Sequence, residues 1–233
     1  MIEDSNTPEL SGKPGRLSLI LTIAAILAGA AAIIAELLAV EGLVYALKPL
    51  VILCIIGVAL LSRRPPAPRY KWAIIAGLIL ALAGDVLLML PYDLFLFGLI
   101  AFAVAQVAYT VAFIAGGGFY RNLRAAVPFL LFGVFMAAFL WSGLEADGML
   151  IPALAYLVVI LLMAWQGLGH WRQTGETRSL LAFLGVLLFV ASDSFLAVNR
   201  FVIDLGDLAP ILVLGTYYPA QGLIGQSAGR EKG

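Results

Sequence analysis

The 233-residue chain is strongly apolar: 63% of its residues are hydrophobic, 12% are charged, and its mean hydropathy is +1.04. Soluble domains carry about a quarter charged residues, so this composition excludes an ordinary soluble domain and indicates a polytopic membrane protein. Fourteen basic and fourteen acidic residues balance, and the chain has no basic run typical of nucleic-acid binding. One cysteine, Cys54, excludes an intrachain disulfide, and no Cys/His cluster predicts a metal site. We expect no metal and no cofactor.

Eight apolar runs are long enough to cross the ~30 Å hydrocarbon layer, which takes about 20 helical residues. The predicted spans are 17–39, 43–61, 72–90, 94–115, 125–144, 149–168, 180–198 and 208–225. Short joints rich in Pro, Gly and charged residues separate them and leave no room for a soluble domain. We therefore predict an all-α integral membrane protein with eight transmembrane helices. Its single polytopic domain, 1–233, comprises a bundle over 17–225 and tails at 1–16 and 226–233.

Basic residues near span ends resist translocation, so their distribution predicts orientation. With both termini inside, the inner side holds twelve of the fourteen basic residues: Lys13, Arg16, Arg63, Arg64, Arg69, Lys71, Arg121, Arg124, Arg172, Arg178, Arg230 and Lys232. The outer joints carry Asp93, Glu145, Asp147, Asp204 and Asp207. This predicts a multi-pass cell-membrane protein with cytoplasmic N- and C-termini. A cleaved signal peptide is the alternative for the first span, because residues 28–31 resemble a cleavage site.

Two segments of the chain resemble each other at an offset of 108 residues. The third span, 77–90, and the seventh, 185–198, align Gly77 with Gly185 and Asp85 with Asp193. At the same offset Tyr109 matches Tyr217. This pattern indicates two parallel repeats of four spans each, with chance matching between Leu/Ala/Gly-rich helices as the alternative.

Asp85 and Asp193 are the polar residues least compatible with lipid. A carboxylate within a span costs several kcal/mol on insertion scales, so it faces a protein interior or water and indicates function. Each aspartate lies thirteen residues into its predicted span, about 20 Å from the inner edge and 10 Å from the outer. The two therefore share one level, and we expect them to meet in one cavity that opens outward.

Further polar residues occur near this level. They are Glu36, Lys48, Gln106, Tyr109, Asn199, Arg200, Tyr217, Tyr218 and Gln221. Alternatively, Asp85 and Asp193 only neutralise Lys48 and Arg200 in structural ion pairs, and the amides only hold helices together. The aromatic residues near span ends are expected to anchor the chain at the membrane interfaces: Tyr45, Tyr70, Trp72, Tyr92, Tyr120, Trp141 and Trp171.

A pair of carboxyl groups in unlike surroundings suits acid–base chemistry, because burial favours the neutral acid and a nearby cation favours the carboxylate. Glycosidases use this division to pass through an oxocarbenium-like centre. The vinyl ether of plasmalogens is open to the same strategy. Protonation of its β-carbon gives an oxocarbenium ion, and addition of water then releases an aldehyde and a glycerol hydroxyl. We therefore predict Asp85 and Asp193 as the acid–base pair.

Five motifs carry a resemblance to a known family. They are KP at 48–49, GDVLLMLP at 84–91, FGLIAFAVAQVAY at 97–109, SDSFLA at 192–197 and TYYPAQGLI at 216–224. In this order they resemble the YhhN-like lysoplasmalogenase family over nearly the whole chain. The resemblance implies a membrane hydrolase that cleaves lysoplasmenyl-ethanolamine or -choline into a fatty aldehyde and glycerophospho-ethanolamine or -choline. On matching positions it implies site roles for Lys48, Asp85, Tyr109, Asp193, Tyr217, Tyr218 and Gln221.

The chain departs from the family pattern at Gln106, where the family usually has histidine. Glutamine donates and accepts hydrogen bonds but does not titrate, so it cannot shuttle a proton. We expect Lys48, Gln106, Tyr109, Asn199, Tyr217, Tyr218 and Gln221 to bind substrate, a single-chain lysophospholipid. Two alternatives remain from the residues alone: a transporter or channel for a small metabolite or lipid, and a non-catalytic lipid-binding protein.

Overall fold

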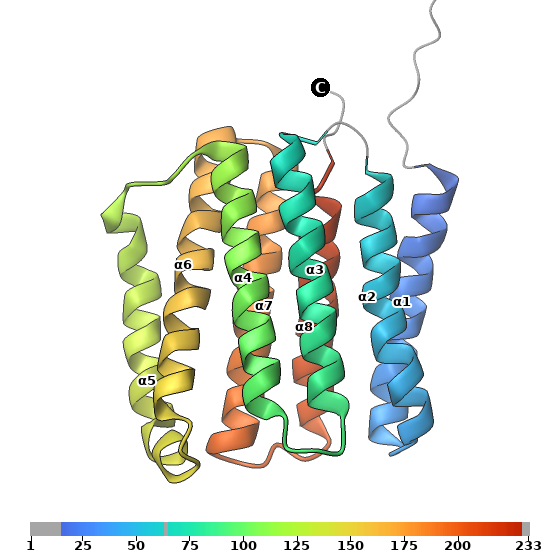
Figure 1. Ribbon diagram of the computed structural model, residues 1–233, viewed down its shortest axis with the longest axis vertical. Helices are drawn as coiled ribbons and strands as arrows, with labels where there is room; N and C mark the ends of the chain where they lie inside the picture. The colour runs from blue at the N-terminus through green and yellow to red at the C-terminus, as the bar shows by residue number, and fades with distance from the viewer. Residues whose placement is uncertain (1–14, 63–64, 230–233) are drawn as a thin grey trace, which may run out of the picture.

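The computed structural model describes residues 15–62 and 65–229, which form eight α-helices and one short 3₁₀ helix. The helices are α1 (Arg16–Leu37), α2 (Glu41–Leu61), α3 (Pro68–Met89), α4 (Phe95–Gly117), α5 (Val127–Ala146), α6 (Leu150–Thr174), α7 (Thr177–Phe201) and α8 (Leu208–Gln226), with η1 (Leu123–Ala126) before α5. Figure 1 shows them as one bundle of upright helices, in which helices consecutive along the chain run antiparallel. The predicted tails lie mostly outside the described residues.

The helices form where the apolar runs occur, because a backbone in hydrocarbon must satisfy its N–H and C=O groups internally. The predicted spans match the helices to within a few residues, except at the joint between α6 and α7. There α6 continues to Thr174 and α7 begins at Thr177. Polar residues extend both helices beyond the apolar runs. Gly175, with a φ of 66°, takes the left-handed conformation that ends α6.

Seven of the eight described helices are long and apolar enough to cross a membrane. The eighth, α8, contains Thr216, Tyr217, Tyr218, Gln221 and Gln226. These side chains lower its hydropathy, although α8 stands beside the other helices over most of the bundle height (Figure 1). The all-helical membrane fold is therefore confirmed.

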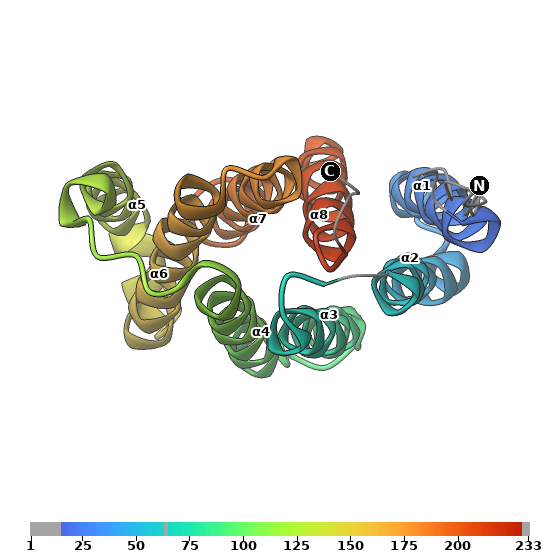
Figure 2. The same cartoon turned by 90° about the horizontal axis from the view of Figure 1, so that it is seen from above.

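Viewed from above, the bundle is elongated (Figure 2). The α1–α2 hairpin lies at one end and the α5–α6 hairpin at the other. Between them, the α3–α4 hairpin packs across from the α7–α8 hairpin. The two aspartates belong to these central hairpins, Asp85 to α3 and Asp193 to α7.

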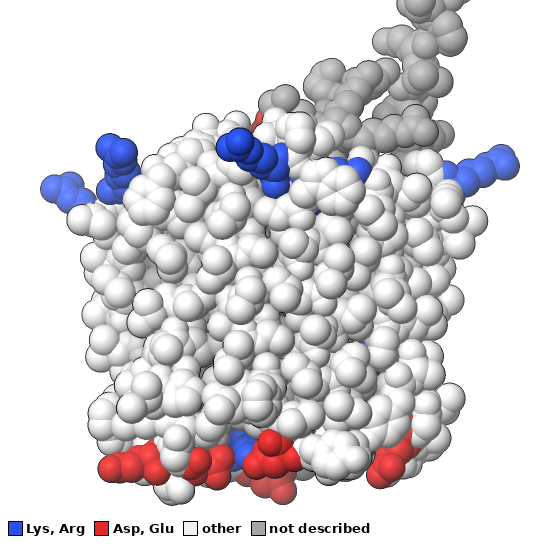
Figure 3. All heavy atoms as spheres, in the orientation of Figure 1, with Lys and Arg blue, Asp and Glu red and all other residues white. Residues whose placement is uncertain are grey.

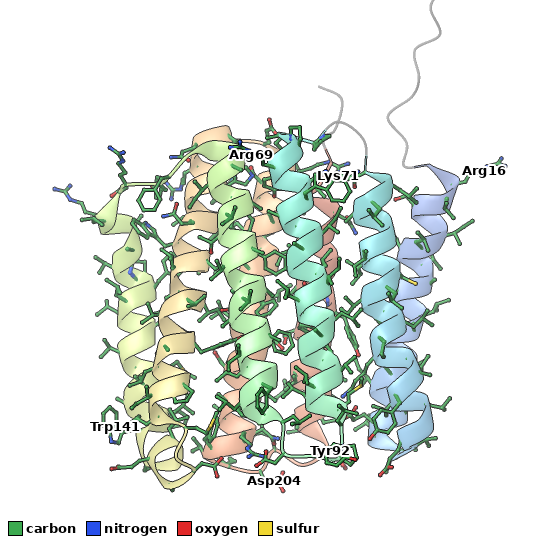
Figure 4. The ribbon with its side chains drawn as sticks, in the orientation of Figure 1. Arg16, Arg69, Lys71, Tyr92, Trp141 and Asp204 are labelled. Carbon is green, nitrogen blue, oxygen red and sulfur yellow. The ribbon has the colours of Figure 1, made fainter. Side chains whose placement is uncertain are left out.

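Charge separates sharply between the two ends of the bundle. Figure 3 shows lysine and arginine at one end and nearly all visible aspartate and glutamate at the other. The basic end holds Arg16, Arg69 and Lys71, and the acidic end holds Asp204 (Figure 4). Below, we call these the basic end and the acidic end.

Most expected interfacial aromatics are exposed at the two ends. Tyr92 and Trp141 lie at the acidic end (Figure 4), and Trp72 is 62% exposed. The expectation for Tyr70 is wrong, because its side chain is fully buried and its hydroxyl hydrogen-bonds to Ser227 Oγ at 2.7 Å. Its position near a span end did not reveal that α8 covers it.

Candidate active site

Asp193 is held by neighbours on two other helices. The hydroxyl of Tyr156, on α6, donates a hydrogen bond to Asp193 Oδ2. The Nε2 group of Gln106, on α4, donates to Tyr156 Oη at 2.5 Å and to Asp193 Oδ2 at 3.3 Å. Gln106 is fully buried, so its amide is fixed in this network. Three helices therefore orient one carboxyl group.

Asp85 is held from α8. The hydroxyl of Tyr217 donates a hydrogen bond to Asp85 Oδ2 at 2.8 Å. One turn further along α8, Gln221 Oε1 accepts a hydrogen bond from Tyr109 Oη at 2.7 Å. Tyr109 is fully buried, and the absence of a side chain at Gly77 makes room for its ring. The expected site residues Tyr109, Tyr217 and Gln221 thus gather on the Asp85 side.

The charge of Asp193 acts on Asp85 only weakly, less than that of Lys48 does. An aromatic group of Phe102, Phe189 and Tyr217 packs beside them, with edge-to-face ring contacts at centroid distances of 5.8 to 6.2 Å. Gly84, directly before Asp85, allows the Phe102 ring to approach α3. Both aspartates are partly buried inside the bundle, and that they share one level stays a prediction.

Asp193 lines a cavity enclosed mainly by α4, α5, α6 and α7. Tyr156 and Ser194 also face it, but the rest of its lining is almost entirely apolar, including Phe102, Met136 and Leu157. Asp85 is not among its lining residues. The structure therefore differs from the expectation of one polar cavity around both carboxyl groups, because Phe102 and its neighbours fill space that the sequence left undefined.

The alternative that Asp85 and Asp193 neutralise Lys48 and Arg200 is wrong. Lys48 Nζ forms its ion pair with Glu36 Oε2 at 2.8 Å. Arg200 lies 3.6 Å from Asp93 and 3.4 Å from Asp147, at the acidic end. Neither of these partly buried aspartates takes part in an ion pair among the described residues, although the charge of Lys48 reaches Asp85.

Two expected binding residues stand apart from the hydrogen bonds around the carboxyl groups. Asn199 Oδ1 accepts a hydrogen bond from the backbone N–H of Leu205, at 2.9 Å, and so holds the connection between α7 and α8. Tyr218 is 92% buried, and its hydroxyl has no hydrogen-bond partner among the described residues. Its ring packs against Tyr217 at a centroid distance of 5.7 Å.

Sequence reasoning missed Tyr156, the residue bonded most directly to Asp193. The position of Tyr156 in the sequence could have revealed it. Tyr156 is the seventh residue of α6 from the acidic end, which places it about 9 Å into the helix, close to the level estimated for Asp193. A tyrosine at that depth is too far from the interface to be an ordinary anchor.

Comparison with known proteins places this arrangement in a family. The YhhN family profile matches residues 43–228. Lysoplasmalogenase TMEM86B of Rattus norvegicus is 33% identical over 173 residues, covering 72% of this chain and 66% of the relative. The same protein of Homo sapiens is 32% identical over 188 residues, covering 79% and 74%. The uncharacterized membrane protein YhhN of Escherichia coli O157:H7 is 26% identical over 146 residues, covering 62% and 68%.

The chain thus spans about two thirds to three quarters of the length of these curated relatives. No solved structure matches it significantly. The matched range begins in α2 and continues through α8, so it contains both aspartates and the tyrosine bonded to each. The chain belongs to the YhhN family.

Proposed function

We propose that the protein is an integral-membrane lysoplasmalogenase in which Asp85 and Asp193 form the catalytic pair. The observation that carries the proposal is the pair itself: two carboxyl groups inside an apolar helix bundle, one on each central hairpin, each fixed by a tyrosine hydroxyl. Buried carboxyl groups inside a membrane are costly and indicate function. Relatives that carry the name lysoplasmalogenase support the choice of reaction.

The reaction needs one proton donor and one base. One carboxyl group donates its proton to the β-carbon of the vinyl ether, which leaves a positive charge shared by the α-carbon and the ether oxygen. The other takes a proton from water as the water oxygen bonds to the α-carbon, which gives a hemiacetal. Cleavage of the bond between the hemiacetal carbon and the glycerol oxygen then releases the fatty aldehyde. The first carboxylate takes the proton of the hemiacetal hydroxyl, and the second carboxyl group gives its proton to the glycerol oxygen, which restores both groups. Water is the only co-reactant.

Neutral donors around the carboxyl groups position the reactants. Gln106 and Tyr156 orient Asp193, and Tyr217 orients Asp85, so both keep the geometry that acid–base catalysis requires. Tyr109, Gln221 and Tyr218 bind substrate or the attacking water beside Asp85. Lys48 binds the phosphate of the headgroup, and Asn199 supports the acidic end, where the headgroup enters.

We also propose the number of membrane spans, their orientation and an internal repeat. The protein crosses the cell membrane eight times, with α8 as the last span, because α8 is as long as a span and packs against α7 and α2. Its basic end faces the cytoplasm. The hairpins α3–α4 and α7–α8 belong to two parallel repeats, which places one aspartate in each.

Replacement of either aspartate tests the function. We expect Asp85→Asn and Asp193→Asn each to lower kcat for aldehyde release from lysoplasmenyl-ethanolamine by at least ~10²-fold, the usual scale of general acid–base catalysis. Asp207→Asn is the control, because Asp207 is exposed at the start of α8. Unchanged rates in either buried variant contradict the mechanism. Solute flux in liposomes without any lipid product identifies a transporter instead.

A further inference from the structure

A second cavity lies between α1, α2 and α8, which we call the α1–α8 cleft. It is lined by one face of each helix, including Ala25 and Gly29 of α1, Val51 of α2, and Gly215, Tyr218 and Gly222 of α8. No charged side chain lines it. Gly215 is exposed, so the cleft opens at the bundle surface, where Figure 2 shows α8 beside the α1–α2 hairpin. An uncharged, apolar occupant that enters from the lipid fits this lining best.

The length of the cleft matches one hydrocarbon chain. Its lining runs from Thr22 to Ile33 along α1 and from Leu214 to Gln226 along α8. At 1.5 Å per residue these stretches are roughly 16 to 18 Å long. One leaflet occupies about half of the ~30 Å hydrocarbon layer, so a single chain of one leaflet has about this length.

Tyr218, which lines this apolar cleft, carries one unpaired polar atom. The side chain is 92% buried, and its hydroxyl has no hydrogen-bond partner within 15–62 and 65–229. Its ring lies against Gly29, where an added Cβ would stand 3.2 Å from the ring. A buried hydroxyl without a partner destabilises the structure, so such a group calls for a partner from a ligand. An oxygen on the chain of a bound ligand would supply this partner.

The charged and polar groups near Tyr218 match the headgroup and the ether oxygen of a lipid. Tyr218 lies within electrostatic range of both Asp85 and Glu36. Glu36 pairs with Lys48, near the acidic ends of α1 and α2. The molecule thus presents a pair of opposite charges, Asp85 with two tyrosines, and an apolar cleft whose lining on α8 continues to Gln226, the last residue of that helix. A lysophospholipid has matching parts: zwitterionic headgroup, ether oxygen and one chain.

We propose that the α1–α8 cleft binds the alkenyl chain of the substrate and that Tyr218 donates a hydrogen bond to the oxygen at the head of that chain. This oxygen is the ether oxygen in the substrate and the carbonyl oxygen in the aldehyde product. The inference rests on the proposed function and adds the position of the chain. It gives α1 a role in substrate binding, although the family match begins only in α2.

Filling the cleft tests the inference without disturbing the carboxyl groups. An added Cβ at Gly222 meets no atom within 4 Å, so Gly222→Leu extends into open space. Gly42→Leu is the matched control, because Gly42 also has open space and lies exposed in the first turn of α2. The probe is a saturated alkyl-ether lysophosphoethanolamine, which has no vinyl group to cleave, prepared with a long and a short chain.

We expect Gly222→Leu to weaken binding of the long-chain probe by roughly 10- to 50-fold, the equivalent of about two or three displaced methylene groups. Binding of the short-chain probe and both affinities of Gly42→Leu should stay within about 3-fold of wild type. Tyr218→Phe should keep its thermal stability, since its hydroxyl has no partner among the described residues, but lose roughly 3- to 10-fold in affinity for both probes.

Ala153→Leu narrows the cavity beside Asp193 and leaves the α1–α8 cleft unchanged. Comparison with Gly222→Leu then shows which of the two cavities binds the chain. If Ala153→Leu discriminates against the long chain and Gly222→Leu does not, the inference is overturned. The same holds if Gly222→Leu binds both probes like Gly42→Leu. Failure of the proposed function gives a different result. If wild-type protein binds the probe in the cleft but releases no aldehyde from lysoplasmalogen, the proposed reaction is wrong and the binding role of the cleft still holds.

Discussion

Tyr156 and Tyr217 perform the same task for different aspartates. Each hydroxyl donates to Oδ2 of its carboxyl group, and each tyrosine stands on a helix other than that of its aspartate. The hydrogen bond fixes the carboxyl plane, and among the described residues no donor reaches Oδ1 of either group. One oxygen of each group is thus held by the protein, and the other is left for the reaction. Tyrosine suits this role because its ring fills apolar space while its hydroxyl remains polar.

Removing the hydroxyl of Tyr156 should therefore affect turnover more than binding. We expect Tyr156→Phe to lower kcat for lysoplasmenyl-ethanolamine roughly 10- to 100-fold, the equivalent of a lost hydrogen bond to a charged group, ~1.5–3 kcal/mol. KM should change by less than about 3-fold, because the ring remains in place. Steady-state kinetics of aldehyde release provide both constants. Tyr45→Phe, at an exposed position in α2, is the control, and equal kcat in the two variants refutes a positioning role for Tyr156.

At the scale of helices, glycine determines how closely the elements around the site approach. Gly77 on α3 leaves the space that the ring of Tyr109 on α4 occupies, and Tyr109 in turn binds Gln221 on α8. We expect Gly77→Ala to destabilise the bundle by about 1–3 kcal/mol, because the added methyl group forces the buried ring to move. Thermal unfolding in detergent measures the effect. Gly42→Ala, with open space around its Cβ, should unfold at the wild-type temperature or above, and an equal loss in both variants rules out the packing explanation.

Helix positions could be predicted from the sequence, whereas contacts between helices could not. The helices were predictable because each apolar run must form internal hydrogen bonds in the membrane. Counting residues also predicts one depth for Asp85 and Asp193, since helix rise is constant. Rotation and neighbour choice are not encoded in a hydropathy pattern. The partnerships of Lys48 with Glu36 and of Tyr156 with Asp193 depend on which helices pack together, and no single segment reveals them.

At the scale of the whole molecule, most basic residues lie at one end of the bundle and most acidic residues at the other. In the described residues the basic end carries Arg16, Arg69 and Lys71, while the acidic end carries Asp204 and the pairs of Arg200 with Asp93 and Asp147. Basic segments resist translocation, so we propose that the basic end stays in the cytoplasm. The headgroup of a substrate then enters from the outer leaflet, near Glu36 and Lys48. The product aldehyde stays in the membrane, while the charged glycerophosphodiester leaves to the outer water.

Membrane topology tests this orientation together with the number of spans. With a cytoplasmic N-terminus, eight spans place the C-terminus in the cytoplasm, whereas seven spans, with α8 outside the bilayer, place it on the opposite side. We expect a fluorescent protein fused after residue 233 to fluoresce in bacterial cells and a periplasmic phosphatase at the same point to stay inactive. A cysteine in place of Asp204, in a chain whose buried Cys54 is replaced by alanine, should react with an impermeant maleimide in intact cells. A cysteine in place of Arg121, between α4 and η1, should react only after permeabilisation.

An active phosphatase fusion together with an accessible Asp204→Cys would mean that α8 does not cross the membrane. Labelling of Arg121→Cys in intact cells would invert the whole bundle and move the proposed headgroup site to the cytoplasmic leaflet.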